Sequence, residues 1–252
     1  MLPRLIPVLL LQNRGLVKSV KFGDYKYIGD PINAVRIFNE KEVDELCLLD
    51  IEVSKKGKEP DYKLIEEIGS EAFIPFSYGG GITSLEQAKI ILKLGAEKLV
   101  LNSVLFTNIN LIRKIADHAG SQSVVASVDV KKNFWGKYEV YAHASKKTMP
   151  LNLPDFLAQL IATGVGEILL NSVDQDGTMQ GLDLALIARL KNNINVPVIA
   201  CGGVGKIEDV KNGIEAGADA VAAGSLFVFH GKHKAVLINY PERKTLQQLW
   251  PQ

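Results

Sequence analysis

Short apolar runs alternate regularly with longer segments of helical periodicity along this chain. Eight runs are apolar along their whole length, at residues 5–11, 46–50, 73–78, 99–102, 124–129, 168–171, 196–200 and 220–223. Seven segments between them carry apolar residues three or four positions apart, at 32–41, 62–68, 85–94, 109–118, 154–163, 184–190 and 207–216. Strands that are apolar throughout are typical of a parallel sheet covered on both faces. Eight strand–helix units therefore predict an α/β protein whose sheet closes into a (β/α)8 TIM barrel.

An internal repeat supports closure of the sheet. Residues 74–103 align without gaps to 196–225, at an offset of 122 that is close to half of the 252 residues. The matched pairs are Pro75 and Pro197, Gly80-Gly81 and Gly202-Gly203, Glu86 and Glu208, Gly95-Ala96 and Gly217-Ala218, and Ser103 and Ser225. The repeat predicts a barrel made of two half-barrels, with residues 1–252 as a single domain because no linker interrupts them. A doubly wound sheet is the alternative, but it rarely combines eight strands with a half-length repeat.

Composition excludes several classes of partner. The chain is 47% hydrophobic, and its formal net charge of +1 provides no overall field to attract nucleic acid or an anionic membrane. The apolar stretch at 5–11 contains Pro7 and is too short for a signal peptide or a membrane span. Cys47 and Cys201 are too few for a disulfide framework, which favours a reducing, cytoplasmic location.

Glycine pairs follow two of the predicted strands, at the end where such barrels carry their sites. A backbone without Cβ lets amide N–H groups approach an anion, and a following helix N-terminus adds positive potential. We therefore predict two phosphate cradles on opposite sides of the barrel mouth, one from Gly80, Gly81, Asn102 and Ser103 and one from Gly202, Gly203, Gly224 and Ser225. Two phosphates imply an elongated, doubly phosphorylated ligand. The structural alternative for each glycine pair is a simple tight turn.

One carboxylate stands between the two cradles. Asp129 closes the run VVASVDV and is expected to project into the mouth, where a carboxylate can act as general acid or base. The alternative is a carboxylate that only orders the neighbouring loops.

Four charged residues stand immediately before predicted strands, at the opposite rim of the barrel: Arg4, Glu45, Lys98 and Glu167. If strand alternation points all four inward, two cations and two anions form a neutral ring of salt bridges that closes the base. Charge exchange within such a ring could open a passage. The alternative is four ordinary surface charges.

Motifs along nearly the whole chain resemble the cyclase subunit of imidazole glycerol phosphate synthase (HisF). The stretches that carry the resemblance are GDP at 29–31, DELCLLDI at 44–51, IPFSYGGGI at 74–82, GAEKLVLNS at 95–103, GSQSVVASVDVK at 120–131, GEILLNSVDQDGT at 166–178, VPVIACGGVGK at 196–206 and GADAVAAGS at 217–225. The related phosphosugar isomerase of histidine synthesis shares the barrel and the cradles, but not the DQDGT-type stretch or the four-charge ring.

The resemblance implies that a glutaminase subunit docks on the base and that its ammonia travels through the barrel to a substrate held by two phosphates. The four charges then correspond to the family's channel gate, and the glycines to its phosphate sites. The resemblance also assigns site roles to Lys18 in the mobile first loop and to Asp50, Asn102, Asp176 and the adjoining Gly177. It implies no cofactor and no metal.

The chain departs from the family at the mouth. The family places catalytic aspartates at the ends of strands 1 and 5; Asp129 keeps the second, but Leu10 replaces the first. Loss of a general acid or base typically costs about 10²–10⁴-fold in rate. Asn171 stands where Thr is usual, and HASKKTMP at 143–150 lacks the family's Gly-containing pattern. These changes indicate a divergent paralogue.

Three functions remain in competition. The first is an ammonia-channelling synthase subunit with Asp129 as the remaining acid–base residue. The second is a weakly catalytic or non-catalytic barrel that conducts ammonia to a sugar amidotransferase of lipopolysaccharide biosynthesis, because this branch resembles barrels encoded with surface-polysaccharide genes. The third is an Amadori-type phosphosugar isomerase, against which Leu10 counts because that reaction also needs two acid–base groups.

Overall fold

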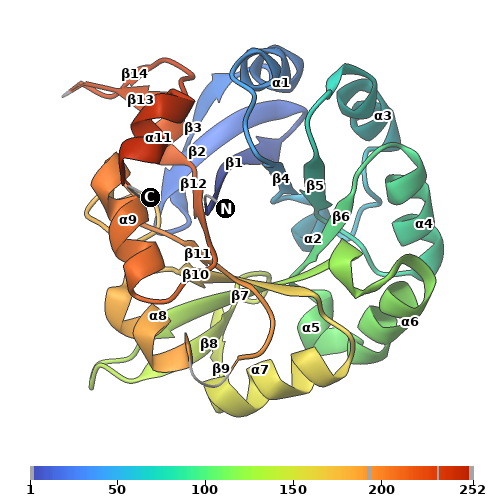
Figure 1. Ribbon diagram of the computed structural model, residues 1–252. Coiled ribbons are helices and arrows are strands. Elements are labelled where there is room, and N and C mark those ends of the chain that lie inside the picture. The colour runs from blue at the N-terminus through green and yellow to red at the C-terminus, as the bar shows by residue number, and fades with distance from the viewer. Residues whose placement is uncertain (1–2, 192–193, 232, 250–252) are drawn as a thin grey trace.

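Eight parallel strands close into a barrel in the computed structural model, which describes residues 3–191, 194–231 and 233–249 (Figure 1). Each strand pairs with the next around the ring, and the last pairs with β1. In order the strands are β1 (Arg4–Gln12), β4 (Leu46–Asp50), β5 (Phe76–Gly79), β6 (Lys98–Leu101), β7 (Val124–Lys132), β10 (Glu167–Ser172), β11 (Val198–Cys201) and β12 (Ala220–Ala223). The predicted (β/α)8 barrel is confirmed.

Helices cover the outside of the barrel (Figure 1). They are α1 (Pro31–Glu40), α3 (Tyr62–Glu71), α4 (Leu85–Lys93), α6 (Ile109–Ala119), α7 (Leu153–Ala162), α8 (Leu184–Leu190), α9 (Ile207–Glu215) and α11 (Arg243–Leu249). Side chains such as Asp61 and Ser84 accept hydrogen bonds from backbone N–H groups of the first turn, which explains where these helices begin. No helix in the described ranges has the length and apolar character needed to cross a bilayer.

Most element boundaries agree with the sequence prediction within two residues, and three differ by three residues: the start of β5, the end of β7 at Lys132 (predicted at 129) and the end of α3 at Glu71 (predicted at 68). The strand predicted at 73–78 is β5, Phe76–Gly79, because Phe73 is 87% exposed and lies in the loop before the strand. The half-barrel repeat is present in the fold: β5, α4 and β6 begin at 76, 85 and 98, and β11, α9 and β12 begin at 198, 207 and 220. The offset of 122 is therefore structural.

Extra elements lie in the connections between the barrel strands and helices. Three antiparallel hairpins were not predicted from the sequence: β2 (Gly15–Val20) with β3 (Gly23–Gly29), β8 (Tyr138–Ala142) with β9 (Lys147–Met149), and β13 (Phe229–His230) with β14 (Ala235–Val236). Four short helices were also not predicted: α2 (Val53–Lys56), α5 (Val104–Thr107) and α10 (Ser225–Val228), which follow strands, and η1 (Ser121–Ser123), which precedes β7. The first two hairpins follow β1 and β7, so they lie at the mouth.

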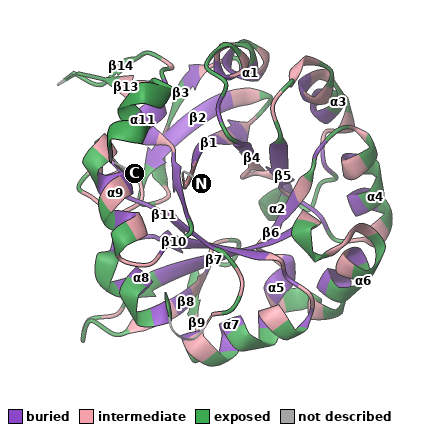
Figure 2. Ribbon diagram, viewed as in Figure 1, coloured by how far each residue is buried: buried purple, intermediate pink, exposed green. Residues whose placement is uncertain are grey.

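Two apolar clusters form the core. The larger lies between the strands and the helices, and the strands and the inner faces of the helices are accordingly buried (Figure 2). The smaller fills the barrel interior and consists of Ile6, Val8, Cys47, Val100, Val125, Leu169, Ile199, Ala220 and Ala222. Side chains two positions apart on a strand share one face, so each barrel strand presents a base, a middle and a mouth position to the interior.

Candidate functional site

The four charges predicted at the base form a closed ring of salt bridges. Arg4 donates to Glu45 at 2.8 Å and to Glu167 at 2.7 Å. Lys98 donates to the same two carboxylates, at 2.8 Å to Glu45 and 3.2 Å to Glu167. The expectation that all four side chains point inward within salt-bridge distance is therefore confirmed. Each cation contacts both anions, so the ring can rearrange without leaving any charge unpaired.

The interior above the ring is apolar. On β1, β6 and β10 the position two residues after the ring residue is Ile6, Val100 and Leu169, and all three belong to the interior cluster. The two cysteines, Cys47 and Cys201, are free. The barrel axis therefore runs from a charged base through an apolar middle to the mouth.

Asp129 is held at the mouth by two side-chain amides. Asn171 Nδ2 donates to Asp129 Oδ1 at 2.9 Å, and Asn102 Nδ2 donates to Oδ2 at 3.0 Å. The carboxyl is buried, and burial raises its pKa to about 7 although both hydrogen bonds lower it. A carboxyl whose pKa lies near neutrality suits proton transfer in either direction. The side chain of Asn102 therefore helps to hold the Asp129 carboxyl in place.

On the opposite half of the mouth, the inward-facing side chains near the ends of three strands are apolar. Leu10 lies beside Leu49 in the strand register, and both pack against the interior cluster together with Cys201. Asn102, Asp129 and Asn171 come from the adjacent strands β6, β7 and β10, whereas these three come from β1, β4 and β11. No carboxylate faces Asp129 from β1, because Leu10 occupies that place.

The second predicted cradle holds an ammonium group. A small pocket of about 40 Å³ is lined by Gly202, Gly203, Gly224 and Ser225 and also by Leu10, Lys18, Ser19 and Asp176. Lys18 Nζ donates to Val8 O at 2.7 Å and lies so near Gly224 that a Cβ there would sit 1.9 Å from it. Burial lowers the pKa of Lys18 to about 8, with Asp176 opposing the effect. The remaining space suits about one water molecule, so a phosphate needs Lys18 to move.

The first predicted cradle is packed against the end of β4 and the short helix α2. Gly81 N–H donates to Ser54 Oγ at 3.1 Å, and a Cβ on Gly80 would lie 2.7 Å from the backbone oxygen of Asp50. Asp50 Oδ1 accepts from the backbone N–H of Glu52 at 3.1 Å and so orders the link between β4 and α2. Ser103 lies at the N-cap of α5. Close packing alone thus explains these glycines, and phosphate binding here stays a prediction.

Two hairpins meet over the mouth. The Phe22 ring at the β2–β3 turn lies 4.5 Å from the His143 ring, centroid to centroid, in an edge-on arrangement. Lys21 N–H donates to Asp176 O at 3.0 Å, and a Cβ on Gly177 would lie 2.1 Å from Ser19 O. Burial raises the pKa of the Asp176 carboxyl to about 6. The loop after β10 therefore clamps the first hairpin across the barrel.

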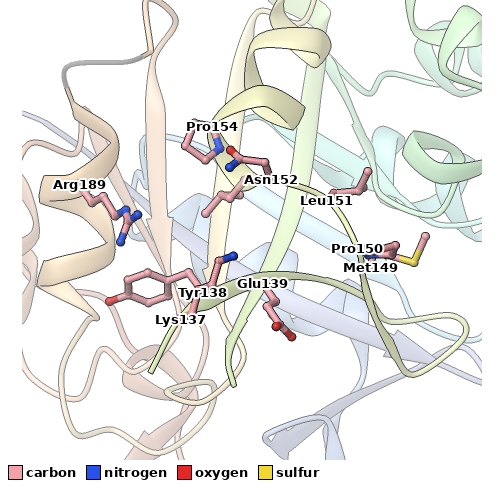
Figure 3. A pocket seen from close by; sticks show the side chains of 10 residues that line it. Lys137, Tyr138, Glu139, Met149, Pro150, Leu151, Asn152, Pro154 and Arg189 are labelled. Atoms are coloured by element: carbon pink, nitrogen blue, oxygen red, sulfur yellow. The ribbon is translucent and has the colours of Figure 1, made fainter. Parts of the chain in front are cut away.

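A larger pocket, of about 300 Å³, lies off the barrel axis between the β8–β9 hairpin and helices α7 and α8 (Figure 3). It is lined by Lys137, Tyr138, Glu139, Met149, Pro150, Leu151, Asn152, Leu153, Pro154 and Arg189. Two of its polar groups serve the fold: Tyr138 Oη donates to Asp183 at 2.8 Å, and Asn152 accepts from the first turn of α7. We place the candidate site at the mouth, where the titratable groups with shifted pKa values converge.

Two mouth residues were not predicted from the sequence. Ser19 Oγ is buried without a hydrogen-bond partner in the described structure and lines the Lys18 pocket. Ser54 Oγ accepts from the Gly81 N–H. Asn171 was expected at the mouth, and its contact with Asp129 is the added finding. A hydroxyl directly after Lys18 was the only signal for Ser19.

The fold and the site together define a (β/α)8 barrel with a salt-bridged base, an apolar interior and a mouth with a buried carboxyl. A family model described as histidine biosynthesis protein matches residues 4–234. Provisionally named imidazole glycerol phosphate synthase subunits from Pseudomonas aeruginosa and Leptospira borgpetersenii are 54% and 51% identical to the chain, covering 95% and 99% of it and 96% and 99% of the relatives. Subunit HisF of the same synthase from Exiguobacterium sibiricum is 38% identical over 90% of the chain and 91% of its own length. The chain belongs to the histidine biosynthesis protein family, among HisF-type paralogues.

Proposed function

We propose that this chain is an ammonia-channelling synthase subunit of the imidazole glycerol phosphate synthase type. A glutaminase partner at the N-terminal face supplies ammonia, and a doubly phosphorylated substrate at the mouth receives it, with Asp129 as the acid–base residue. The observation that carries the proposal is the base ring. Four salt bridges close the barrel directly below an apolar interior that leads to the buried carboxyl.

The interior suits ammonia rather than ammonium. A charge in an apolar interior costs several kcal/mol, whereas a small neutral molecule avoids that cost. The ring supports controlled entry, because Lys98 can release one glutamate while it keeps the other at hydrogen-bond distance. A docked partner that offers a further carboxylate to this lysine would favour the open arrangement.

Substrate binding needs a rearrangement at the mouth. A phosphate in the second cradle takes the place of the Lys18 ammonium, which can then pair with that phosphate. Since Lys18 belongs to β2, its movement is linked to opening of the first hairpin. Catalysis is weakened relative to a site with two carboxylates, because Leu10 cannot exchange a proton.

The direct test mixes the purified protein with the doubly phosphorylated aminoimidazole-carboxamide substrate and ammonium salt, and measures imidazole glycerol phosphate. A second assay adds the glutaminase subunit from the same genome and glutamine. Lys98→Ala should uncouple glutamine hydrolysis from product formation, while Lys89→Ala on the exposed face of α4 should not. Equal coupling in both variants would refute the role of the ring.

A second candidate function is an ammonia-conducting barrel that serves a sugar amidotransferase in lipopolysaccharide biosynthesis. The apolar half of the mouth around Leu10 and the filled second cradle favour it. It predicts glutamine-dependent amidation of a sugar only when both partners are present, and no imidazole glycerol phosphate. The isomerase alternative predicts conversion of an aminoaldose phosphate without ammonia, and Asp129 would have to act there without a second carboxylate.

A further inference from the structure

Asn171 offers an unused acceptor at the top of the barrel interior. Its Nδ2 donates to Asp129 Oδ1 at 2.9 Å, and the residue is 7% exposed. Its Oδ1 is buried and receives no hydrogen bond from the described residues. When Asp129 is ionised, as it is at about pH 9, the amide cannot turn over without placing its oxygen against the carboxylate oxygen, so the orientation is fixed in that state.

A buried carbonyl without a donor costs about 1–3 kcal/mol, so such an atom in a site marks the place of a ligand's N–H or O–H group. The backbone of β11 lies close to this oxygen, so a ligand that reaches it must be small. A Cβ on Gly202 would lie 2.9 Å from Asn171 Oδ1, and Cys201 is the register neighbour of Asn171 on β11. Asn171 is also where this chain departs from the threonine of its family.

The position of Asn171 relates it to the apolar interior. Glu167, Leu169 and Asn171 occupy alternate positions of β10, so they run along one face from the base ring through the interior cluster to the mouth. Asn171 is therefore the first polar side chain above the apolar cluster on β10, and on the neighbouring β7 the inner face continues from Val125 through Ser127 to Asp129.

We propose that Asn171 Oδ1 is the acceptor that receives ammonia at the mouth and holds it beside Asp129. Ammonia has three N–H donors and one lone pair, so an acceptor binds it through N–H and leaves the lone pair free to attack, whereas a donor would mask the lone pair. This inference rests on the proposed function, in which ammonia travels through the barrel.

Asn102 is the matched control. It donates to the other oxygen of Asp129 at 3.0 Å and to Ser127 O at 2.9 Å, and its carbonyl is not among the buried atoms without a partner. If Asn171 only holds Asp129 in place, Asn171→Leu and Asn102→Leu should have equal effects. If it also binds ammonia, only Asn171→Leu should weaken ammonia binding.

The test is an NMR titration of protein with 15N-labelled asparagine, in which the side-chain amides report binding without any turnover. Ammonium chloride is added at about pH 9, and trimethylammonium chloride, whose free base has no N–H donor, serves as the control titrant. The Asn171 amide should shift saturably with ammonia and not with trimethylamine. The Asn102 amide in Asn171→Leu should show no saturable shift, while Asn102→Leu should keep the ammonia affinity within about twofold.

Equal or non-saturating shifts with both amines would overturn the inference, since they indicate only bulk effects or an ordered water at Oδ1. If Asn171→Leu does not fold, the comparison of the two amines on the unaltered protein still decides. In the turnover assay Asn171→Leu should raise the KM for ammonia about tenfold, which corresponds to about 1.4 kcal/mol, and Asn102→Leu should lower kcat alone. Absence of turnover in the unaltered protein would refute the proposed function, whereas the titration separately decides the role of Asn171.

Discussion

Removal of Lys98 from the base ring should destabilise the fold by a measurable amount. Its ammonium lies 2.8 Å from Glu45 and 3.2 Å from Glu167, with side-chain exposures of 18%, 6% and 12% for the three residues. An exposed ion pair contributes about 0–1 kcal/mol, and loss of one partner from a fully buried pair costs about 3–5 kcal/mol. The burial of the ring lies between these limits, so Lys98→Met should lower the free energy of unfolding by about 2–3 kcal/mol. For a chain of this length that lowers Tm by about 5–10 °C.

A double-mutant cycle measured by urea unfolding separates the coupling energy between Lys98 and Glu45 from the other effects of each substitution. Glu45→Gln in the Lys98→Met background leaves Arg4 paired with Glu167 through bonds of 2.7 and 3.4 Å, and the ring is again neutral. The double variant should therefore be more stable than the sum of the single losses by at least ~1 kcal/mol. Additive losses, or a single loss below ~0.5 kcal/mol, would show that solvent screens these charges and that the ring does not act as a unit.

Leu10→Asp should raise ammonia-dependent turnover about tenfold, or about 1.4 kcal/mol of transition-state stabilisation; an unchanged kcat in a folded variant would contradict the role given to this position. Burial raises the pKa of Asp129 from 3.8 to about 7, so between these pH values the native state keeps a proton that the unfolded chain has lost. The free energy of unfolding should therefore fall as the pH rises from about 4 to 7, and Asp129→Asn should flatten that slope in urea titrations. Burial lowers the pKa of Lys18 from 10.5 to about 8, so between these pH values the unfolded chain binds a proton that the native state has lost. The free energy of unfolding should therefore rise as the pH increases from about 8 to 10.5, and Lys18→Met should abolish this rise. Phe22→Ala should speed amide hydrogen exchange in the β2–β3 hairpin and leave exchange in the barrel strands unchanged, since the contact with His143 holds the hairpin tip. Equal hairpin exchange rates in the variant and the unaltered protein would refute this role of Phe22.

The barrel and its ring were predictable because both follow from short-range periodicity. Arg4, Glu45, Lys98 and Glu167 each precede an apolar run, and the alternation of strand side chains places all four on the inner face at one level. The glycine pairs were visible as turns for the same local reason. Their role was less clear, because close packing and anion binding both require glycine.

The contacts at the mouth were not predictable, since they depend on how separate loops fold back over the barrel. The sequence analysis assigned Asn102 to a phosphate cradle, whereas its side chain donates to Asp129, which comes from the next strand. Lys18 lies in the second cradle because β2 turns back antiparallel to β1, through a turn with positive φ at Asn13 and Arg14. No local pattern around residues 15–29 predicted the β2–β3 hairpin that follows, whose tip uses positive φ at Lys21 and Phe22.

In the proposed function, the half-barrel symmetry accounts for one centre of proton transfer at the mouth rather than two. The offset of 122 relates Asn171 to Leu49 and Asn102 to Gly224, and Asp129 on β7 lies opposite Leu10 on β1. Every polar member of the Asp129 cluster thus has an apolar residue or glycine as its counterpart. In that second half the Lys18 side chain occupies the space over Gly224. If a doubly phosphorylated ligand displaces Lys18 with one phosphate, as the proposed function requires, we expect its reacting atoms to lie toward β6, β7 and β10, on the side of Asp129.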